Sequence, residues 1–181
     1  MKKRFLIGIA LMLLAAVGLF AQTPVQSWAK SYNRDGQIDL YASVGYWLGI
    51  CVSATGEYVI GEWNIGGIPF DYGVQVMGIF ENYSTDILTE TFSVNYWGVA
   101  PMFAVHMGLS NAPFEFIVAA GLGFYGYMTD EPSLDDQGFG GIGFATSETA
   151  IWYFADNMGL LVQFAYVGAT SIWGIGIRYG F

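Results

Sequence analysis

Positive charge is scarce in this chain. The 181 residues include 6 Lys and Arg against 15 Asp and Glu. Three of the six bases lie within the first four residues, and the rest of the chain has only Lys30, Arg34 and Arg178. Proteins bind nucleic-acid phosphates through Lys and Arg. The composition therefore excludes nucleic acid as a partner.

Cysteine and long apolar runs are scarce as well. Cys51 is the single cysteine, so an internal disulfide is impossible and a framework of disulfides is excluded. We expect it to be a small buried hydrophobic residue. Beyond residue 20 the sequence has no apolar run near the roughly 20 residues that a membrane-spanning helix needs.

The first 21 residues have the layout of a secretory signal peptide. Residues 2–4 are basic, residues 5–20 are apolar and uncharged, and Ala21 precedes polar Gln22. We predict cleavage after Ala21; the alternative is a retained helix, for which the apolar run is short. The predicted organisation is a signal peptide (1–21), a periplasmic segment (22–36) and one domain (37–181). The chain that follows the signal peptide has a net charge of −12, from 3 bases and 15 acids.

The remaining chain is rich in the residues that strands and tight turns use. Hydrophobic residues make up 54% and aromatic residues 18% of the sequence, the mean hydropathy is +0.45, and there are 25 glycines. Aromatic residues favour strands and glycine favours turns. A chain this apolar without a spanning helix indicates a membrane β-barrel.

Apolar residues alternate with polar or small ones along most of the chain, which is the pattern of strands with two different faces. The final segment is an example, since every second residue from Trp173 to Phe181 is large and apolar. Eight such segments predict an all-β fold, an eight-stranded antiparallel up-and-down transmembrane barrel. The predicted strands are 38–47, 54–65, 70–81, 95–108, 114–128, 139–154, 158–167 and 172–181.

The predicted connections alternate between short and long. Residues 66–69, 110–113 and 155–157 are short and rich in Gly, Pro, Asn and Asp, whereas 82–94 and 129–138 are longer and acidic. Transmembrane barrels have short periplasmic turns and longer outer loops. The pattern predicts acidic extracellular loops, with both ends of the barrel on the periplasmic side.

The end of the chain carries a resemblance to a known family. Alternation back to Trp173 and the final Tyr179-Gly180-Phe181 resemble the last strand of bacterial outer-membrane barrels, in which a terminal aromatic residue is read by the assembly machinery. With eight strands, the chain resembles the small barrels typified by outer membrane protein X and the membrane domain of outer membrane protein A. The resemblance implies a lipid bilayer and the assembly machinery as partners, with Tyr179 and Phe181 as the assembly signal. The near absence of Lys and Arg is a departure from the pattern of this family.

The two faces of the predicted strands have different tasks. One face supplies aromatic girdles at the membrane interfaces, and the other points into a lumen just wide enough for side chains to fill. The predicted girdle residues are Trp63, Tyr72, Phe80, Trp97, Tyr153, Trp173 and Tyr179. The predicted polar network of the lumen is Asp39, Glu62, Asn64, Asp71, Gln75, His106, Glu115, Gln163 and Arg178. We expect Asp39 and Arg178 to pair across the seam between the first and last strands.

No catalytic, metal or cofactor site is expected. The single histidine, His106, has no nucleophile among its neighbours by alternation, and a nucleophile needs its base within hydrogen-bond reach. The acidic residues 130–136 lack the ligand spacing and central glycine of an EF-hand loop.

The sequence favours a membrane-structural protein that interacts with an extracellular partner through its acidic loops. Two alternatives stay open: a narrow cation-preferring pore, and a soluble periplasmic barrel that binds an apolar ligand.

Overall fold

The computed structural model describes residues 29–32, 34–87, 90–129 and 139–181, and of residues 85–87 and 90–92 it describes the backbone alone. The predicted signal peptide (1–21), residues 22–28 and most of the acidic segment 129–138 lie outside the described residues.

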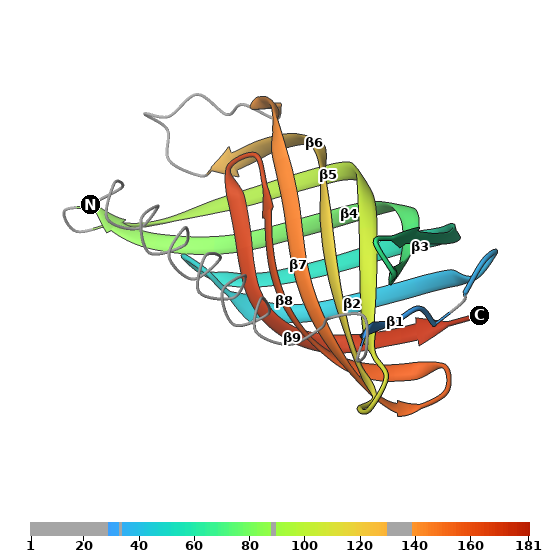
Figure 1. Cartoon of the computed structure of the whole chain (residues 1–181). Helices are drawn as coiled ribbons and strands as arrows, with labels where there is room; N and C mark the ends of the chain where they lie inside the picture. Colours follow the sequence, from blue (N-terminus) through green and yellow to red (C-terminus); the bar gives the residue numbers. More distant parts are fainter. Residues whose placement is uncertain (1–28, 33, 88–89, 130–138) are drawn as a thin grey trace.

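Eight strands close into a barrel, as predicted (Figure 1). Strands β2 to β9 pair antiparallel in chain order, and β2 also pairs with β9, which leaves no open edge around the ring. The strands are β1 (Ala29–Lys30), β2 (Ile38–Tyr46), β3 (Ile50–Ile65), β4 (Ile68–Ile87), β5 (Glu90–Leu109), β6 (Phe114–Thr129), β7 (Gly141–Ala155), β8 (Met158–Val167) and β9 (Thr170–Gly180).

We call the two ends of the barrel the terminal end and the hairpin end. The terminal end holds the start of β2, the end of β9 and the turns 66–67, 110–113 and 156–157; the hairpin end holds the other four connections. Two of those four, residues 47–49 and 168–169, are as short as the terminal turns. The predicted contrast between short and long connections therefore holds for only part of the hairpin end.

The predicted loop 82–94 is mostly strand. The β4–β5 ladder continues to Ile87↔Glu90, beyond the last β3–β4 pair, Ile50↔Asn82. These two strands project past the rest of the wall as a two-stranded ribbon (Figure 1). The loop prediction was wrong because Tyr, Thr and Phe in this stretch favour strands and outweigh its acidic residues.

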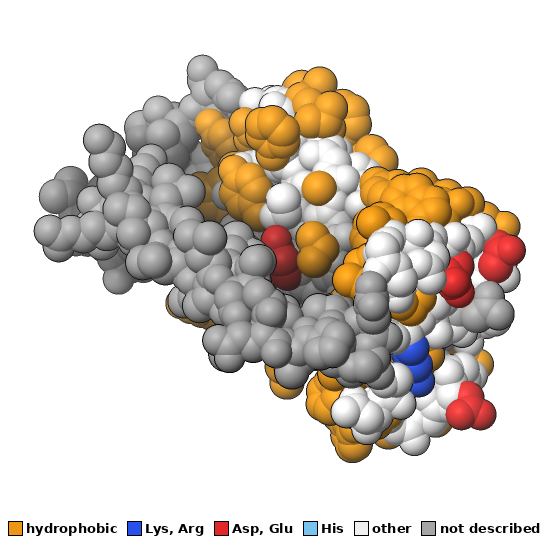
Figure 2. Space-filling model, viewed as in Figure 1, with side chains coloured by type: hydrophobic (Ala, Val, Ile, Leu, Met, Phe, Trp, Pro, Cys, Tyr) orange, Lys and Arg blue, Asp and Glu red, His pale blue; other side chains and the backbone are white. Residues whose placement is uncertain are grey.

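The outer wall is apolar. Large hydrophobic residues point outward from every barrel strand, among them Leu40, Val52, Val76, Phe103, Val118, Phe144, Val162 and Ile175. Figure 2 shows hydrophobic side chains over the visible wall with one acidic side chain among them, while the other visible acidic and basic side chains lie at the end where the C-terminus is. Among the described residues no helix is long and apolar enough to cross a membrane.

The lumen is filled with side chains, and much of it is apolar. The inward residues that are buried together include Met77, Ile79, Ala100, Met102, Ile117, Ile151, Leu161, Val167 and Ile172. Charged residues gather mainly at the terminal end. The lumen is therefore divided along its length.

A short segment before the barrel lies at its terminal end. Strand β1 pairs with Gly108 and Leu109 of β5, just beyond the last β4–β5 pair, Asp71↔His106. The chain then turns back at Gly36, whose φ of +81° suits glycine and whose N–H donates to the Val59 carbonyl at 3.0 Å. We call residues 29–36 the strap.

Candidate functional site

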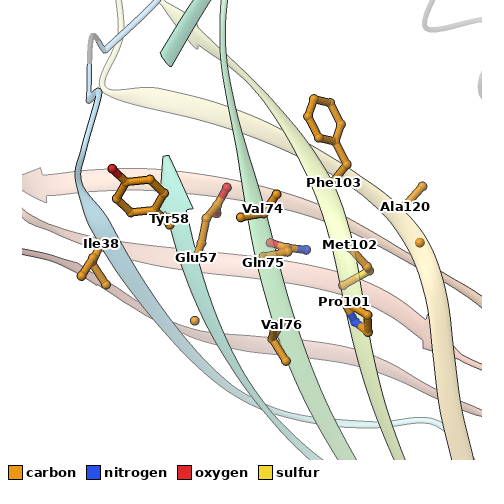
Figure 3. Close-up of a pocket in the computed structure, with 12 residues that line it drawn as sticks. Ile38, Glu57, Tyr58, Val74, Gln75, Val76, Pro101, Met102, Phe103 and Ala120 are labelled. Carbon is orange, nitrogen blue, oxygen red and sulfur yellow. The ribbon is translucent and has the colours of Figure 1, made fainter. Parts of the chain in front are cut away.

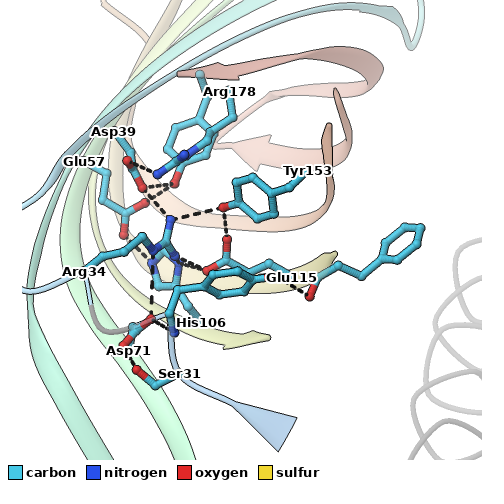
Figure 4. Close-up of polar contacts among 12 residues, drawn as sticks. Ser31, Arg34, Asp39, Glu57, Asp71, His106, Glu115, Tyr153 and Arg178 are labelled. Carbon is cyan, nitrogen blue, oxygen red and sulfur yellow. Dashed lines mark hydrogen bonds and ion pairs between the residues drawn. The ribbon is translucent and has the colours of Figure 1, made fainter. Parts of the chain in front are cut away.

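Charged side chains from six barrel strands and the strap, with a tyrosine of a seventh strand, meet inside the terminal end (Figure 4). We call this group the ion cluster, which consists of Arg34, Asp39, Glu57, Asp71, His106, Glu115, Tyr153 and Arg178. All except the half-buried Tyr153 are buried. The alternation of β2, β4, β5, β6 and β9 predicted five of these residues, and the structure brings those five together.

Arg34 joins the strap to the barrel wall. Its guanidinium donates to Asp39 Oδ2 at 2.8 Å and to Glu115, and its Nε lies 3.9 Å from Asp71 Oδ2. Ser31 and the Tyr32 N–H also bind the Asp71 carboxylate. One cation thus contacts carboxylates from three strands, β2, β4 and β6.

Burial lowers the pKa of Arg34, but the carboxylates of Glu115 and Asp39 more than offset this, so its pKa lies above the ordinary value. Arg34 therefore remains charged inside the lumen. The sequence did not predict its place there, because it belongs to no strand and alternation says nothing about it.

His106 lies between two carboxylates. Its Nε2 is 2.5 Å from Glu57 Oε1, and its Nδ1 is 3.0 Å from Glu115 Oε1. The Tyr41 hydroxyl donates to Glu57 at 2.7 Å. Within the described chain no Ser, Thr or Cys side chain hydrogen-bonds to His106.

Arg178 and Asp39 form an ion pair across the seam between β2 and β9, as predicted. Asp39 is directly opposite Gly180 and Arg178 is opposite Tyr41, so the two charged residues are diagonal neighbours. Asp39 thus binds both guanidiniums of the ion cluster, from Arg34 and from Arg178.

Two corrections to the predicted network concern β3, and a β-bulge explains the first of them. The register of β3 against β4 shifts between Val59 and Gly61, so the side-chain parity of β3 changes there. Glu57 faces the lumen, whereas counting back from Glu62 in steps of two placed it outside. Glu62 and Asn64 are exposed at the end of β3, and Asn64 accepts a hydrogen bond from the Gly67 N–H in the turn at 2.9 Å.

Tyr153 is a further correction, because it was predicted as a girdle residue. It follows the buried residues Thr149 and Ile151 on the inward face of β7, and its hydroxyl donates to Glu115 inside the barrel. Its neighbour Trp152 is exposed on the outer wall instead.

The other two predicted lumen residues are also buried. Gln163 lies near mid-barrel, where its amide oxygen accepts from Ser43 and Ser53 and its nitrogen donates to Ser147 and Thr149. Gln75 is directly opposite Glu57 of the ion cluster.

Glu81 organises the hairpin end, and the sequence had not marked it as a site residue. Its carboxylate accepts from the N–H groups of Leu48 and Gly49 at 2.7 and 3.0 Å, and from the Thr170 hydroxyl at 3.1 Å. One buried carboxylate therefore holds two tight connections of the hairpin end together.

The remaining predicted girdle residues lie on the outer wall in two groups. At the terminal end Trp63 stacks on Tyr72 with 4.2 Å between the ring centroids, and Tyr179 meets Phe181 edge-on with 4.7 Å between the centroids. Toward the hairpin end Phe80 is directly opposite Trp97 on the neighbouring strand, and the ring centroids of Trp173 and Phe164 are 5.0 Å apart.

The outer wall is grooved where small residues lie between large ones. A groove of about 600 Å³ runs over β2 to β6, and its outward side chains include Ile38, Tyr58, Val74, Val76 and Phe103 (Figure 3). Glu57, Gln75 and Met102 alternate with these residues and are buried on the lumen side. The groove is thus an apolar feature of the outer wall.

The described residues contain no group of three or more His, Cys, Asp or Glu placed to hold a metal ion. Cys51 is buried, and its thiol donates to the carbonyl of Ser171.

No protein-family model matches the sequence, and no curated protein matches it. Solved structures do match. The N-terminal β-barrel domain of Pseudomonas aeruginosa OprF superposes with a TM-score of 0.53 at 15% identity, covering 81% of this chain and 98% of that domain. The chain has the fold of a small outer-membrane barrel. Ail of Yersinia pestis, solved in complex with the heparin analogue sucrose octasulfate, gives a TM-score of 0.51 at 12% identity, covering 81% of this chain and 99% of Ail.

Proposed function

We propose that this chain is an integral protein of a bacterial outer membrane, in which a closed barrel carries an acidic surface at its hairpin end. The apolar outer wall is the observation that carries the proposal. Soluble monomers rarely expose an apolar patch of more than a few hundred Å², whereas here large apolar side chains face outward from every barrel strand. A bilayer is the environment that suits such a wall.

The soluble-barrel alternative is disfavoured by the same wall. A soluble barrel that binds an apolar ligand needs a polar exterior and an apolar cavity. This barrel has apolar residues outside and a lumen filled by its own side chains.

The filled lumen also argues against a pore. The ion cluster and strap occupy the terminal end, and the apolar residues around Met77 and Ile172 fill the lumen beyond it. We therefore propose an anchoring role rather than transport. In a planar bilayer the purified protein should give no steady conductance, and a stable cation-selective current would support the pore instead.

The charge of the hairpin end indicates the chemistry of its partner. No Lys or Arg occurs between Arg34 and Arg178, so the hairpin-end connections lack bases, while residues 129–138 alone contain four acids. Ail has been solved with a sulfated sugar analogue, but a surface without bases repels such an anion. We propose a cationic partner, recognised through the acidic residues of the hairpin end.

Vesicles that contain the folded protein test this proposal with two probes, polylysine and heparin. Polylysine should bind, and its binding should weaken with added salt. Changing Asp130, Glu131, Asp135 and Asp136 to their amides should reduce polylysine binding, whereas the matched terminal-end variant Asp156→Asn should not. Heparin binding, or equal polylysine binding by the amide variant, would contradict the proposed partner.

A further inference from the structure

One carboxylate lies on the apolar outer wall. Glu148 of β7 is exposed, while its neighbours Ser147 and Thr149 are buried in the lumen. Glu148 is opposite Val118 on β6 and Phe164 on β8, and the only irregularity in the pairing of β7 comes later, between Tyr153 and Ala155. Its outward direction therefore follows from a regular ladder.

The surroundings of Glu148 are apolar along the strand in both directions. Toward the hairpin end the outward series of β7 reaches Phe144, and toward the terminal end it reaches Trp152; both are exposed. Glu148 lies midway between them, four residues from each. If the wall faces lipid, as the proposed function holds, this carboxyl group sits deep in the hydrocarbon, where a polar group without a hydrogen-bond partner is costly.

The described residues offer this carboxyl group no base. Within the described residues, Glu148 forms an ion pair with none of the bases, because Lys30, Arg34 and Arg178 all lie at the terminal end. In a second copy inserted in the same direction, these bases also lie at the terminal end, away from Glu148. A self-association must therefore satisfy Glu148 through its neutral acid form, which has one O–H donor and further acceptor sites.

The wall beside Glu148 allows close approach. Thr146 and Ala150 precede and follow it on the outward face of β7, and Ala120 lies beside them on β6, opposite Thr146. Small residues let membrane-embedded surfaces approach each other closely, and interfacial Thr side chains hydrogen-bond across such contacts.

We propose that the outward face of β7 around Glu148 is the contact surface for a second copy of this chain. A two-fold axis parallel to the barrel axis brings Glu148 of one copy opposite Glu148 of the other at the same depth. The two carboxylic acids then exchange O–H···O hydrogen bonds, and the two Thr146 hydroxyls meet one level nearer the hairpin end. This inference rests on the membrane location proposed above.

Cysteine cross-linking in floated vesicles tests the proposal. In a Cys51→Ala background that keeps Glu148, Ala150→Cys on the same outward face of β7 should give a disulfide-linked dimer on oxidation. Ala54→Cys, on the outward face of β3 across the ring, should stay monomeric. Equal dimer yields for the two variants would overturn the proposal. If the protein does not float with the vesicles, the membrane location itself is wrong.

The oligomeric state of Glu148 variants supplies a second readout. Wild-type protein and Glu148→Gln, which keeps donor and acceptor, should sediment as dimers in detergent. Glu148→Val, which leaves an apolar wall, should be a folded monomer. Wild-type protein that is monomeric in floated vesicles would overturn the proposed dimer. A transmembrane partner that carries a base would then be the occupant of this face.

Discussion

Arg34 is the residue on which the closure of the terminal end depends most. Removing it leaves the carboxylates of Asp39, Asp71 and Glu115 buried with one fewer cation. Breaking a buried ion pair by removing one partner costs about 3–5 kcal/mol, whereas an exposed pair contributes about 0–1 kcal/mol.

We therefore expect Arg34→Ala to lower the free energy of unfolding by about 3–5 kcal/mol. Lys30→Ala changes the same strap outside the ion cluster and serves as the matched control, with a small expected effect. Urea unfolding in detergent measures both. Equal effects of the two changes would mean that the strap acts through packing and not through the Arg34 guanidinium.

Asp39 and Arg178 should show coupled energetics across the seam. Because Arg178 binds Asp39 directly, the double variant Asp39→Ala/Arg178→Ala should lose less stability than the sum of the two single variants. A double-mutant cycle from unfolding curves measures the difference. Simple additivity would show that the pair contributes nothing beyond its separate residues.

The strands could be predicted from alternation, and the exceptions have physical causes. Parity along β2, β4, β5, β6 and β9 placed Asp39, Asp71, His106, Glu115 and Arg178 on the lumen side. Parity fails beyond a bulge, which is why Glu57 was missed. It cannot assign a residue outside the strands, which is why Arg34 was missed.

The two faces of β4 and β6 should respond differently to charge. Arg or Lys at the midplane of a barrel's lipid face costs about 2–4 kcal/mol. Val76→Arg and Val118→Arg, both on exposed apolar positions, should therefore impair membrane insertion. Gln75→Arg should be milder, because Gln75 faces the lumen opposite Glu57. Folded protein in vesicles is the measurement, and equal insertion of all three variants would contradict the two faces.

The last strand carries the predicted assembly signal. The Phe181 N–H donates to the Ile38 carbonyl at 2.9 Å, and the ring packs against Tyr179. Deleting Phe181 should leave export intact and reduce accumulation in the outer membrane, as measured by fractionation and heat-modifiable mobility. Unchanged accumulation would mean that this residue is not read during assembly.

At the scale of the whole molecule, one arrangement underlies these predictions: a wall whose apolar side faces lipid around a lumen closed by its own side chains. The structure resembles outer-membrane barrels in fold, and beyond residue 4 the chain has only three bases. The number of strands was predictable because each strand carries its own pattern. The strap was not, since it depends on contacts between residues far apart in the chain.

A cysteine scan along β6 tests this arrangement most directly. In a Cys51→Ala background, single cysteines are placed at residues 116–120 of the vesicle-inserted protein and treated with a lipid-soluble and a water-soluble maleimide. We predict that the lipid-soluble reagent labels positions 116, 118 and 120, which are exposed, and that neither reagent labels the buried positions 117 and 119. Labelling of 116, 118 and 120 by the water-soluble reagent, or labelling without a two-residue period, would contradict it.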